Sequence, residues 1–199
     1  MTWWLPLILE KARPAKRTVG AVAGMDSNYK NGFVFSDGQQ VETHIYERIQ
    51  QFGKRQKNTF AEIDSMVGQS LKQVDWSNIK TLAIEELKRV KQGKRGTFSR
   101  QLNRRLSHWL YRATAARIER VCEENGIRLE RKDPWKTSQT CRACGKGDKR
   151  SRKGDQFVCV HCGHSDHADF NAAKNLQYLA TAGIYGFRSP QNSKRQSFG

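Results

Sequence analysis

Four of the five cysteines of this chain fall in two closely spaced pairs, Cys141 and Cys144, then Cys159 and Cys162. Two residues separate the members of each pair, and a glycine follows each second cysteine. Such a turn directs both sulfurs of a pair to one point, because glycine tolerates the positive φ that the turn tends to need. Two facing turns form a tetrahedral S4 site, the usual structural site for Zn2+. We therefore predict a zinc ribbon in which the metal supports folding.

Two alternatives remain open at this cluster. A histidine could replace one thiolate, and the chain has His161, His164 and His167 nearby. A redox pair would also use this spacing, although paired CxxC motifs inside a cell favour zinc. The fifth cysteine, Cys122, stands alone in a helical pattern, and we expect it to be a small buried side chain.

Three acidic residues stand where predicted elements begin or end. Asp26 follows an apolar strand, Glu85 follows a second one, and Asp169 falls in the first turn of the last predicted helix. Strand alternation favours Glu85 over its neighbour Glu86. Carboxylates that converge at one sheet edge can hold two Mg2+ or Mn2+ ions, which activate water and stabilise the leaving oxygen of a phosphodiester. Taken singly, each is more commonly a solvated turn residue, and it is their joint order that favours metal binding.

The elements that would position these residues alternate between strands and helices. Periodicity predicts an α/β fold with a central sheet and flanking helices, into which the ribbon is inserted before the last helix. The expected strands are 18–25, 33–35, 41–45, 81–84 and 127–132, and the expected helical segments are 47–74, 99–125 and 168–183.

The composition favours a polyanionic partner. The 199 residues have a net charge of +17 and a sequence pI near 10.0, and such a field attracts nucleic acid or an anionic membrane. No apolar run approaches the ~20 residues of a membrane span, and the N-terminal residues make a poor signal peptide. We therefore expect a cytoplasmic protein that acts on nucleic acid and has no membrane partner.

Basic residues gather after Glu85 and between the cysteine pairs. A charge run is usually a solvated face, but here its position beside the acidic residues favours contacts with a DNA backbone, single-stranded at the active site. The residues predicted to contact nucleic acid are Lys88, Arg89, Lys91, Lys94, Arg95, Arg104, Arg105, Lys149 and Arg150.

Four segments of the chain carry a family resemblance. The sequences are GMDSNYKNGFVFSDG, LAIEEL, KTSQTCRACG with CVHCG, and ADFNAAKNL, in that order. The chain resembles the C-terminal half of the TnpB (OrfB) proteins of insertion sequences and their relatives, the type V CRISPR effector nucleases. The match covers most of residues 18–182. It implies a RuvC-like, RNase H-like fold, catalytic metal binding by Asp26, Glu85 and Asp169, and RNA-guided DNA cleavage.

The resemblance also implies a division into domains. We expect a short extension at 1–17, a RuvC-like domain at 18–139 and 165–188, a zinc ribbon at 140–164, and a flexible tail at 189–199. Family members have a long N-terminal lobe, whereas only residues 1–17 precede the first expected strand here. The chain is therefore expected to be a fragment, a minimal relative or a decayed copy, and a guide RNA, a partner chain or a second copy is left open as partner.

The chain departs from the family motifs at two places. Ser27 and Asn28 replace the Leu-Gly that usually follows the first aspartate of the family. His167 stands two positions before the last aspartate, Asp169, where the family often has an acidic residue. An alternative function is thus a catalytically weak nucleic-acid-binding remnant or subunit. A third possible function is that of a zinc-ribbon protein of the translation or transcription apparatus. This function would leave the acidic motifs unexplained.

Overall fold

The computed structural model describes residues 12–28, 30–51, 59–86, 111–133 and 136–182. Its main feature is a five-stranded sheet with the strand order β3-β2-β1-β4-β5. The first three strands are antiparallel neighbours, whereas β1, β4 and β5 run parallel. The strands are β1 (Ala21–Asn28), β2 (Gly32–Phe35), β3 (Gln40–Val41), β4 (Ile79–Glu85) and β5 (Arg128–Lys132).

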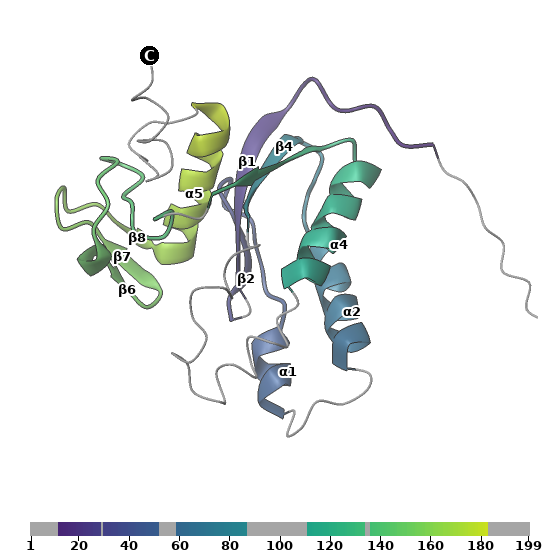
Figure 1. The fold of residues 1–199 in the computed structure, drawn as a ribbon, viewed down its shortest axis with the longest axis horizontal. Helices are drawn as coiled ribbons and strands as arrows, with labels where there is room; N and C mark the ends of the chain where they lie inside the picture. The colour runs from purple at the N-terminus through teal and green to yellow at the C-terminus, as the bar shows by residue number, and fades with distance from the viewer. Residues whose placement is uncertain (1–11, 29, 52–58, 87–110, 134–135, 183–199) are drawn as a thin grey trace, which may run out of the picture.

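Helices cover both faces of this sheet (Figure 1). Helices α2 and α4 lie on one face, and α5 lies on the other. The described helices are α1 (Ile45–Gln51), α2 (Thr59–Leu71), α4 (Tyr111–Glu124) and α5 (Ala168–Thr181). The predicted mixed α/β fold with flanking helices is therefore confirmed.

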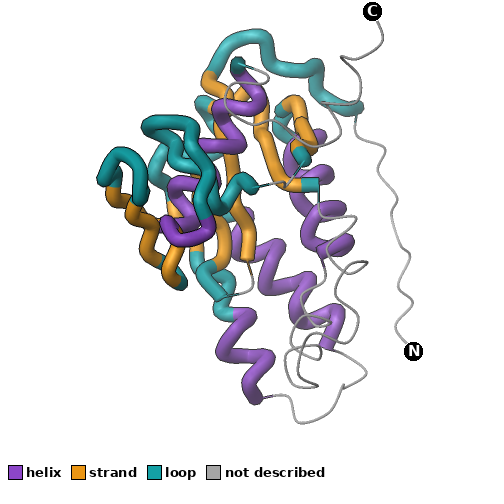
Figure 2. The backbone as a smooth tube through the Cα atoms, turned by 60° about the vertical axis from the view of Figure 1, so that its left-hand side comes forward, coloured by secondary structure: helices purple, strands orange, loops and turns teal. Residues whose placement is uncertain are grey.

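A second, three-stranded sheet lies beside α5, on the side away from the main sheet (Figures 1 and 2). Its strand order is β6-β7-β8, and both pairings are antiparallel. Its strands are β6 (Arg152–Lys153), β7 (Gln156–Val158) and β8 (Ser165–His167), and the 3-10 helix η2 (Lys149–Ser151) directly precedes β6. β8 leads directly into α5, so the inserted unit and the last helix share a continuous backbone.

The hydrophobic core fills the space between the sheet and α2 and α4. Alternate residues of β1 and β4 point into it, including Met25 and Leu82, and both are almost completely buried. Helix α2 contributes Ile63 and Val67, and α4 contributes Ile118. Cys122 of α4 is also in this core with 1% exposure, as predicted.

The opposite face of β1 approaches α5 very closely at Gly24. A Cβ atom at this position would lie 2.0 Å from the carbonyl oxygen of Ala173 and 2.4 Å from the backbone nitrogen of Gln177. Gln177 also donates from Nε2 to the carbonyl of Val22 at 2.7 Å. This contact sets the position of α5 against the sheet.

Several boundaries differ from the sequence predictions. β1 continues to Asn28, because its pairing with β2 extends to Asn28 and Gly32, so Asp26 lies within the strand. The expected strand at 41–45 is reduced to Gln40–Val41, since His44 has a left-handed φ of 52° and α1 starts at the next residue. The predicted helix 99–125 is described from Tyr111, and residues 99–110 lie outside the described part.

Within the described ranges, no helix is both long and apolar enough to cross a membrane.

Candidate metal sites

The four predicted zinc ligands come together at one end of the three-stranded sheet. Their sulfur atoms all lie within 4.8 Å of one another. The Sγ atoms of Cys141 and Cys162 are 3.7 Å apart, and those of Cys144 and Cys159 are 3.6 Å apart. A tetrahedron with Zn–S bonds of 2.3 Å has edges of about 3.8 Å, so the sulfurs already have the spacing that Zn2+ requires.

Backbone N–H groups favour the thiolate at one of these sulfurs, whereas burial raises the pKa of Cys141 to about 12. Although burial opposes it, hydrogen bonds from the backbone of His161 and Cys162 lower the pKa of Cys159 to about 7. Gly145 and Gly163 close the two turns through hydrogen bonds to the carbonyls of Cys141 and Cys159. Both glycines have positive φ, 71° and 73°, as the CxxCG pattern predicts. The residues fit a closed structural zinc site.

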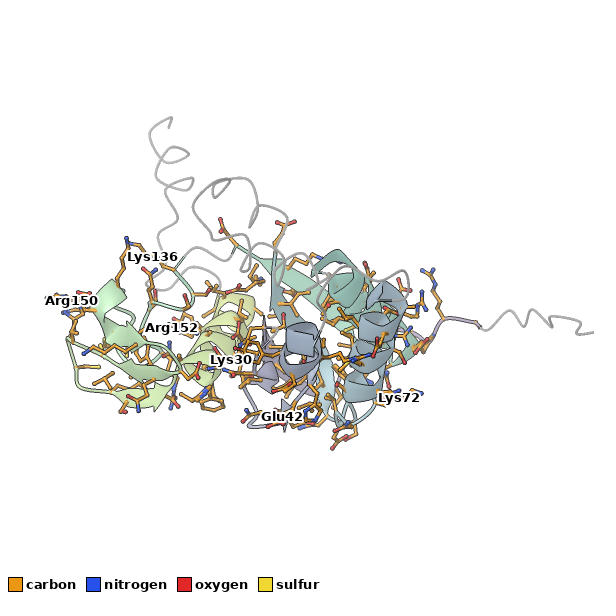
Figure 3. The ribbon with its side chains drawn as sticks, turned by 90° about the horizontal axis from the view of Figure 1, so that it is seen from below. Lys30, Glu42, Lys72, Lys136, Arg150 and Arg152 are labelled. Carbon is orange, nitrogen blue, oxygen red and sulfur yellow. The ribbon has the colours of Figure 1, made fainter. Side chains whose placement is uncertain are left out.

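The segment between the cysteine pairs presents basic side chains to solvent. Lys149 and Arg150 of η2 are exposed, and Figure 3 shows Arg150 at the outer edge of the ribbon. Arg150 Nη2 pairs with Asp148 Oδ2 at 2.8 Å, and its hydrogen bonds lower the pKa of Asp148 to about 2. Of the residues predicted to contact nucleic acid, these two are described. The other seven, from Lys88 to Arg105, lie outside the described residues.

The main sheet brings Asp26 and Glu85 to neighbouring positions. Met25 of β1 pairs with Ile84 of the parallel strand β4, so the acidic residue that follows each of them lies at the same level of the sheet. Asp26 alternates with Met25, and therefore shares the α5 face of β1 with Gly24. Asp169, in the first turn of α5, is completely buried above them.

Glu85 and Asp169 lie close enough to Asp26 to influence its ionisation. Burial raises the pKa of Asp26 well above its usual value, and the charges of Glu85 and Asp169 raise it further. A hydrogen bond with Asp169 has the same effect, because it favours the protonated Asp26. Burial also raises the pKa of Glu85, against the opposing influence of Thr137 and Arg152. Two half-buried acids whose pKa values are raised, beside the buried Asp169, form a setting in which a bound cation is favourable.

Four neutral or cationic groups contact these acids. Arg152 of β6 donates from Nη2 to Asp169 Oδ1 at 3.0 Å. Asn28 and Asn31, on either side of the β1–β2 turn, donate to Asp169 Oδ2 at 2.9 and 2.6 Å. Thr137 donates from its hydroxyl to Glu85 Oε1. Figure 3 shows Arg152 on the side of the ribbon that faces α5.

Sequence reasoning did not single out any of these four groups for the site. Arg152 is one of several basic residues between the cysteine pairs, and Thr137 belongs to the motif that precedes the first pair. Asn28 stands where the family has glycine, and the structure shows that its side chain orients Asp169. The TSQTC motif was the one signal that could have drawn attention to Thr137.

The donor set fits hard divalent cations, since carboxylate oxygens are the ligands that Mg2+ and Mn2+ prefer. The carboxylates are less closely gathered than the cysteines. In the described part of the chain, the cysteines form the one group of three or more potential ligands whose atoms all lie within 4.8 Å of one another. Two separate ions, each bound by some of the acids, would suit this wider arrangement.

A polar pocket of about 150 Å3 lies at the β1–β2 turn, and none of the three acids lines it. The β1–β2 turn contributes Lys30 and Asn31, and the ribbon contributes His167. Lys30 Nζ pairs with Asp155 Oδ2 at 2.7 Å, which joins this turn to the ribbon. Gln40, Glu42, His44 and Glu47 complete the lining.

The fold and the two sites define a class: a mixed α/β sheet with acids at one edge and an inserted four-cysteine ribbon. Sequence comparison identifies the relatives more narrowly. The model of the family described as "Cas12f1-like, TNB domain" matches residues 111–176. A CRISPR-associated endodeoxyribonuclease Cas12f1 from Sulfoacidibacillus thermotolerans is 40% identical over 75 residues, which cover 37% of this chain and 18% of that protein.

A TnpB-like protein from Aquifex aeolicus is 34% identical over 101 residues, covering 49% of this chain and 32% of the relative. The chain is therefore TnpB-related, and the resemblance seen in its motifs is confirmed. The matched regions span less than a third of the length of these two curated relatives.

Solved structures support the same fold. A Cas12f1–sgRNA–target DNA complex matches with a TM-score of 0.56 at 20% identity, covering 78% of this chain and 49% of that one. CasPhi-2 (Cas12j) bound to crRNA matches with a TM-score of 0.50 at 18% identity, covering 73% of this chain and 24% of the other. These likenesses show that this chain shares the fold of a part of those Cas12 proteins.

Proposed function

We propose that this chain is the RuvC-like nuclease part of a TnpB-related protein and cleaves DNA phosphodiester bonds with Mg2+ or Mn2+. The observation that carries the proposal is the convergence of Asp26, Glu85 and Asp169 from two parallel strands and the first turn of α5. Their burial and mutual repulsion make a bound cation favourable. The four cysteines are proposed to hold a structural Zn2+.

Each side chain has a distinct role in this proposal. Asp26, Glu85 and Asp169 hold the cations, which supply two-metal activation of water and stabilisation of the leaving oxygen when bound. Asn28 and Asn31 keep Asp169 in one orientation by donating to Oδ2. Arg152 contacts the other oxygen of Asp169, and its guanidinium is suited to a phosphate oxygen of a strand that reaches the acids.

The proposed substrate is DNA that is single-stranded where it meets the acids. The exposed Lys149 and Arg150 would contact its backbone, and such contacts position a strand without reading its sequence. The similarity to a Cas12f1 protein solved with guide RNA and target DNA supports a guide RNA as a further partner. We also propose that a partner chain or a second copy of this chain supplies the recognition of nucleic acid. We expect this activity in the cytoplasm.

The test is cleavage of end-labelled single-stranded DNA by zinc-loaded protein in Mg2+ or Mn2+. The informative variant is Asp169→Asn, which keeps the shape of the side chain but removes its charge. The matched control is Asp155→Asn, an acid that contacts Lys30 and Asn31 at the edge of the same region. We expect Asp169→Asn to lower cleavage more than about 100-fold, beyond the usual cost of losing an outer-shell partner. Asp155→Asn should stay within a few-fold of wild type.

A second candidate function is nucleic-acid binding without cleavage. The contact between Arg152 and Asp169 favours it, because this guanidinium partly neutralises the acids without any metal. The same assay separates the two functions. If wild type and both variants bind DNA equally and none cuts it, the chain is a binding module and the nuclease proposal is wrong.

A further inference from the structure

Two buried asparagines of α5 attach the helix to the segment that enters the first cysteine pair. Asn175 donates from Nδ2 to the carbonyls of Thr137 and Thr140, at 2.8 and 2.7 Å. Asn171, one turn earlier, donates to the carbonyl of Thr140 at 2.8 Å and accepts from the backbone of Arg142 at 3.0 Å. Both asparagines are at most 2% exposed. Buried amides with this many partners fix the backbone that they contact.

The segment held in this way is a single tight turn. Lys136 has a left-handed φ of 57°, and its carbonyl accepts hydrogen bonds from the backbone of Gln139 and Thr140. The turn continues directly into Cys141, whose backbone bonds to the carbonyl of Lys146 inside the first cysteine turn. The conformation of residues 136–141 is therefore determined from one side by α5 and from the other by the cysteine cluster.

This turn carries Thr137, which is 1% exposed and donates its hydroxyl to Glu85 Oε1. A glutamate has three rotatable side-chain bonds, and its orientation costs conformational entropy unless a partner holds it. A hydroxyl bonded to one carboxylate oxygen fixes the plane of the group and leaves the second oxygen for a cation. Outer partners of metal ligands commonly act in this way.

We propose that Thr137 is a positioning residue for Glu85, and that Asn175 and the cysteine turn hold Thr137 in place. The cysteine site and the acid site are then coupled through one hydroxyl. This inference rests on the proposed function, since it gives Glu85 a role in metal binding. It goes beyond it by assigning the threonine that precedes the zinc ribbon to the chemistry of the main sheet.

A purely structural role for Thr137 is the competing explanation, because a buried threonine also packs. The two are separated by a pair of substitutions. Thr137→Val keeps the shape and removes the hydroxyl, whereas Thr137→Ser keeps the hydroxyl and removes the methyl group. If packing alone matters, valine is the milder change; if donation to Glu85 matters, serine is.

The measurement is Mn2+ affinity of the zinc-loaded chain without DNA, from the electron paramagnetic resonance signal of free Mn2+, followed by the cleavage rate. We expect Thr137→Val to weaken Mn2+ binding about 10-fold or more. Thr137→Ser should stay within about 3-fold of wild type, and zinc content should be unchanged in both. Both valine and alanine remove the hydroxyl that pairs with Glu85. Alanine is smaller and crowds the site less, so Thr137→Ala serves as a second variant in case valine impairs folding. The same loss of Mn2+ affinity is expected of it.

Asn175→Ala tests the support of Thr137 separately. It removes the bonds to the two carbonyls, so we expect it to weaken both Mn2+ binding and resistance of the zinc to chelators. Equal Mn2+ affinity in wild type, Thr137→Val and Thr137→Ala would overturn the inference and leave the proposed function intact. If wild type binds no more Mn2+ than Asp26→Asn, the proposed function itself has failed, and the role of Thr137 fails with it.

Discussion

The close approach of β1 and α5 at Gly24 leads to a quantitative prediction for Gly24→Ala. The added Cβ would meet the carbonyl oxygen of Ala173 at 2.0 Å, whereas ordinary contacts begin at 3.4 Å. The obstacle is helix backbone, which cannot rotate away as a side chain can. Overpacking of this kind costs about 1–3 kcal/mol, and we expect the upper end here, partly offset by the better strand propensity of alanine. The net loss should be about 2–3 kcal/mol of unfolding free energy.

This loss would be measured by thermal and denaturant unfolding of the zinc-loaded protein. For a chain of this size, about 2–3 kcal/mol corresponds to a decrease in Tm of about 4–12 °C. Function should suffer more than stability, because Asp169 lies one turn before Ala173 on the helix that must move. A displacement of about 1 Å at a reacting group can lower the rate about 100-fold. We therefore expect cleavage to fall strongly even at temperatures where the variant is fully folded.

The matched control is Gly68→Ala in the last turn of α2. Its Cβ would also meet an atom at 2.3 Å, but that atom is the end of the Arg117 guanidinium, which can move aside. Alanine is favoured over glycine within a helix by up to about 1 kcal/mol, so the control should be neutral or stabilising. If Gly24→Ala unfolds within about 0.5 kcal/mol of wild type, α5 does not approach β1 as described, and the placement of Asp169 loses its structural basis.

Three further predictions concern charge, zinc and pH. Lys149→Ala should reduce the steepness of log affinity against log salt for single-stranded DNA by about 0.7. Lys72→Ala should leave this slope unchanged, because Lys72 lies at the opposite end of the molecule in Figure 3. Equal slopes in the two variants would exclude a contact between the ribbon and the DNA. Removal of zinc by a chelator should lower Tm and abolish Mn2+ binding, because the ribbon continues into the first turn of α5 with Asp169 and follows the turn that carries Thr137; unchanged Mn2+ affinity would contradict the coupling. Burial raises the pKa of Asp26, so its ionisation destabilises the metal-free fold increasingly as pH rises above about 4. Asp26→Asn should therefore exceed wild type in Tm by a margin that grows with pH, and a shrinking margin would refute this sign.

The gathering of the four cysteines and the topological order of the acids could be predicted because both depend on local signals. The ligand spacing is confined to residues 141–162, and each acid stands beside an apolar run whose period is visible in the sequence. Strand ends in a parallel pair meet at one edge, so Asp26 and Glu85 were expected to be neighbours before their register was known. The catalytic role of these residues stays a prediction, as does the division of the chain into domains.

The partners of the acids could not be predicted, because they depend on register and on contacts between distant segments. Asn28 is separated from Asp169 by 141 positions, and only the pairing of β1 with β2 brings the turn to the helix. Arg152 and Lys153 are adjacent basic residues, and nothing in the local pattern distinguishes them. The pairing of β6 with β7 determines which one faces the acids.

The position of the ribbon in the chain also has a physical consequence. β8 ends at His167 and α5 begins at Ala168, whose backbone N–H donates to the carbonyl of Asp155 at 2.8 Å within the ribbon. The first turn of α5, which contains Asp169, is thus an extension of the sheet that the cysteines stabilise. The same helix meets β1 at Gly24 and holds the turn of Thr137 through Asn175. A metal bound by the cysteines can therefore stabilise two of the three acids in their positions, Asp169 through the backbone and Glu85 through a hydroxyl, without contacting either.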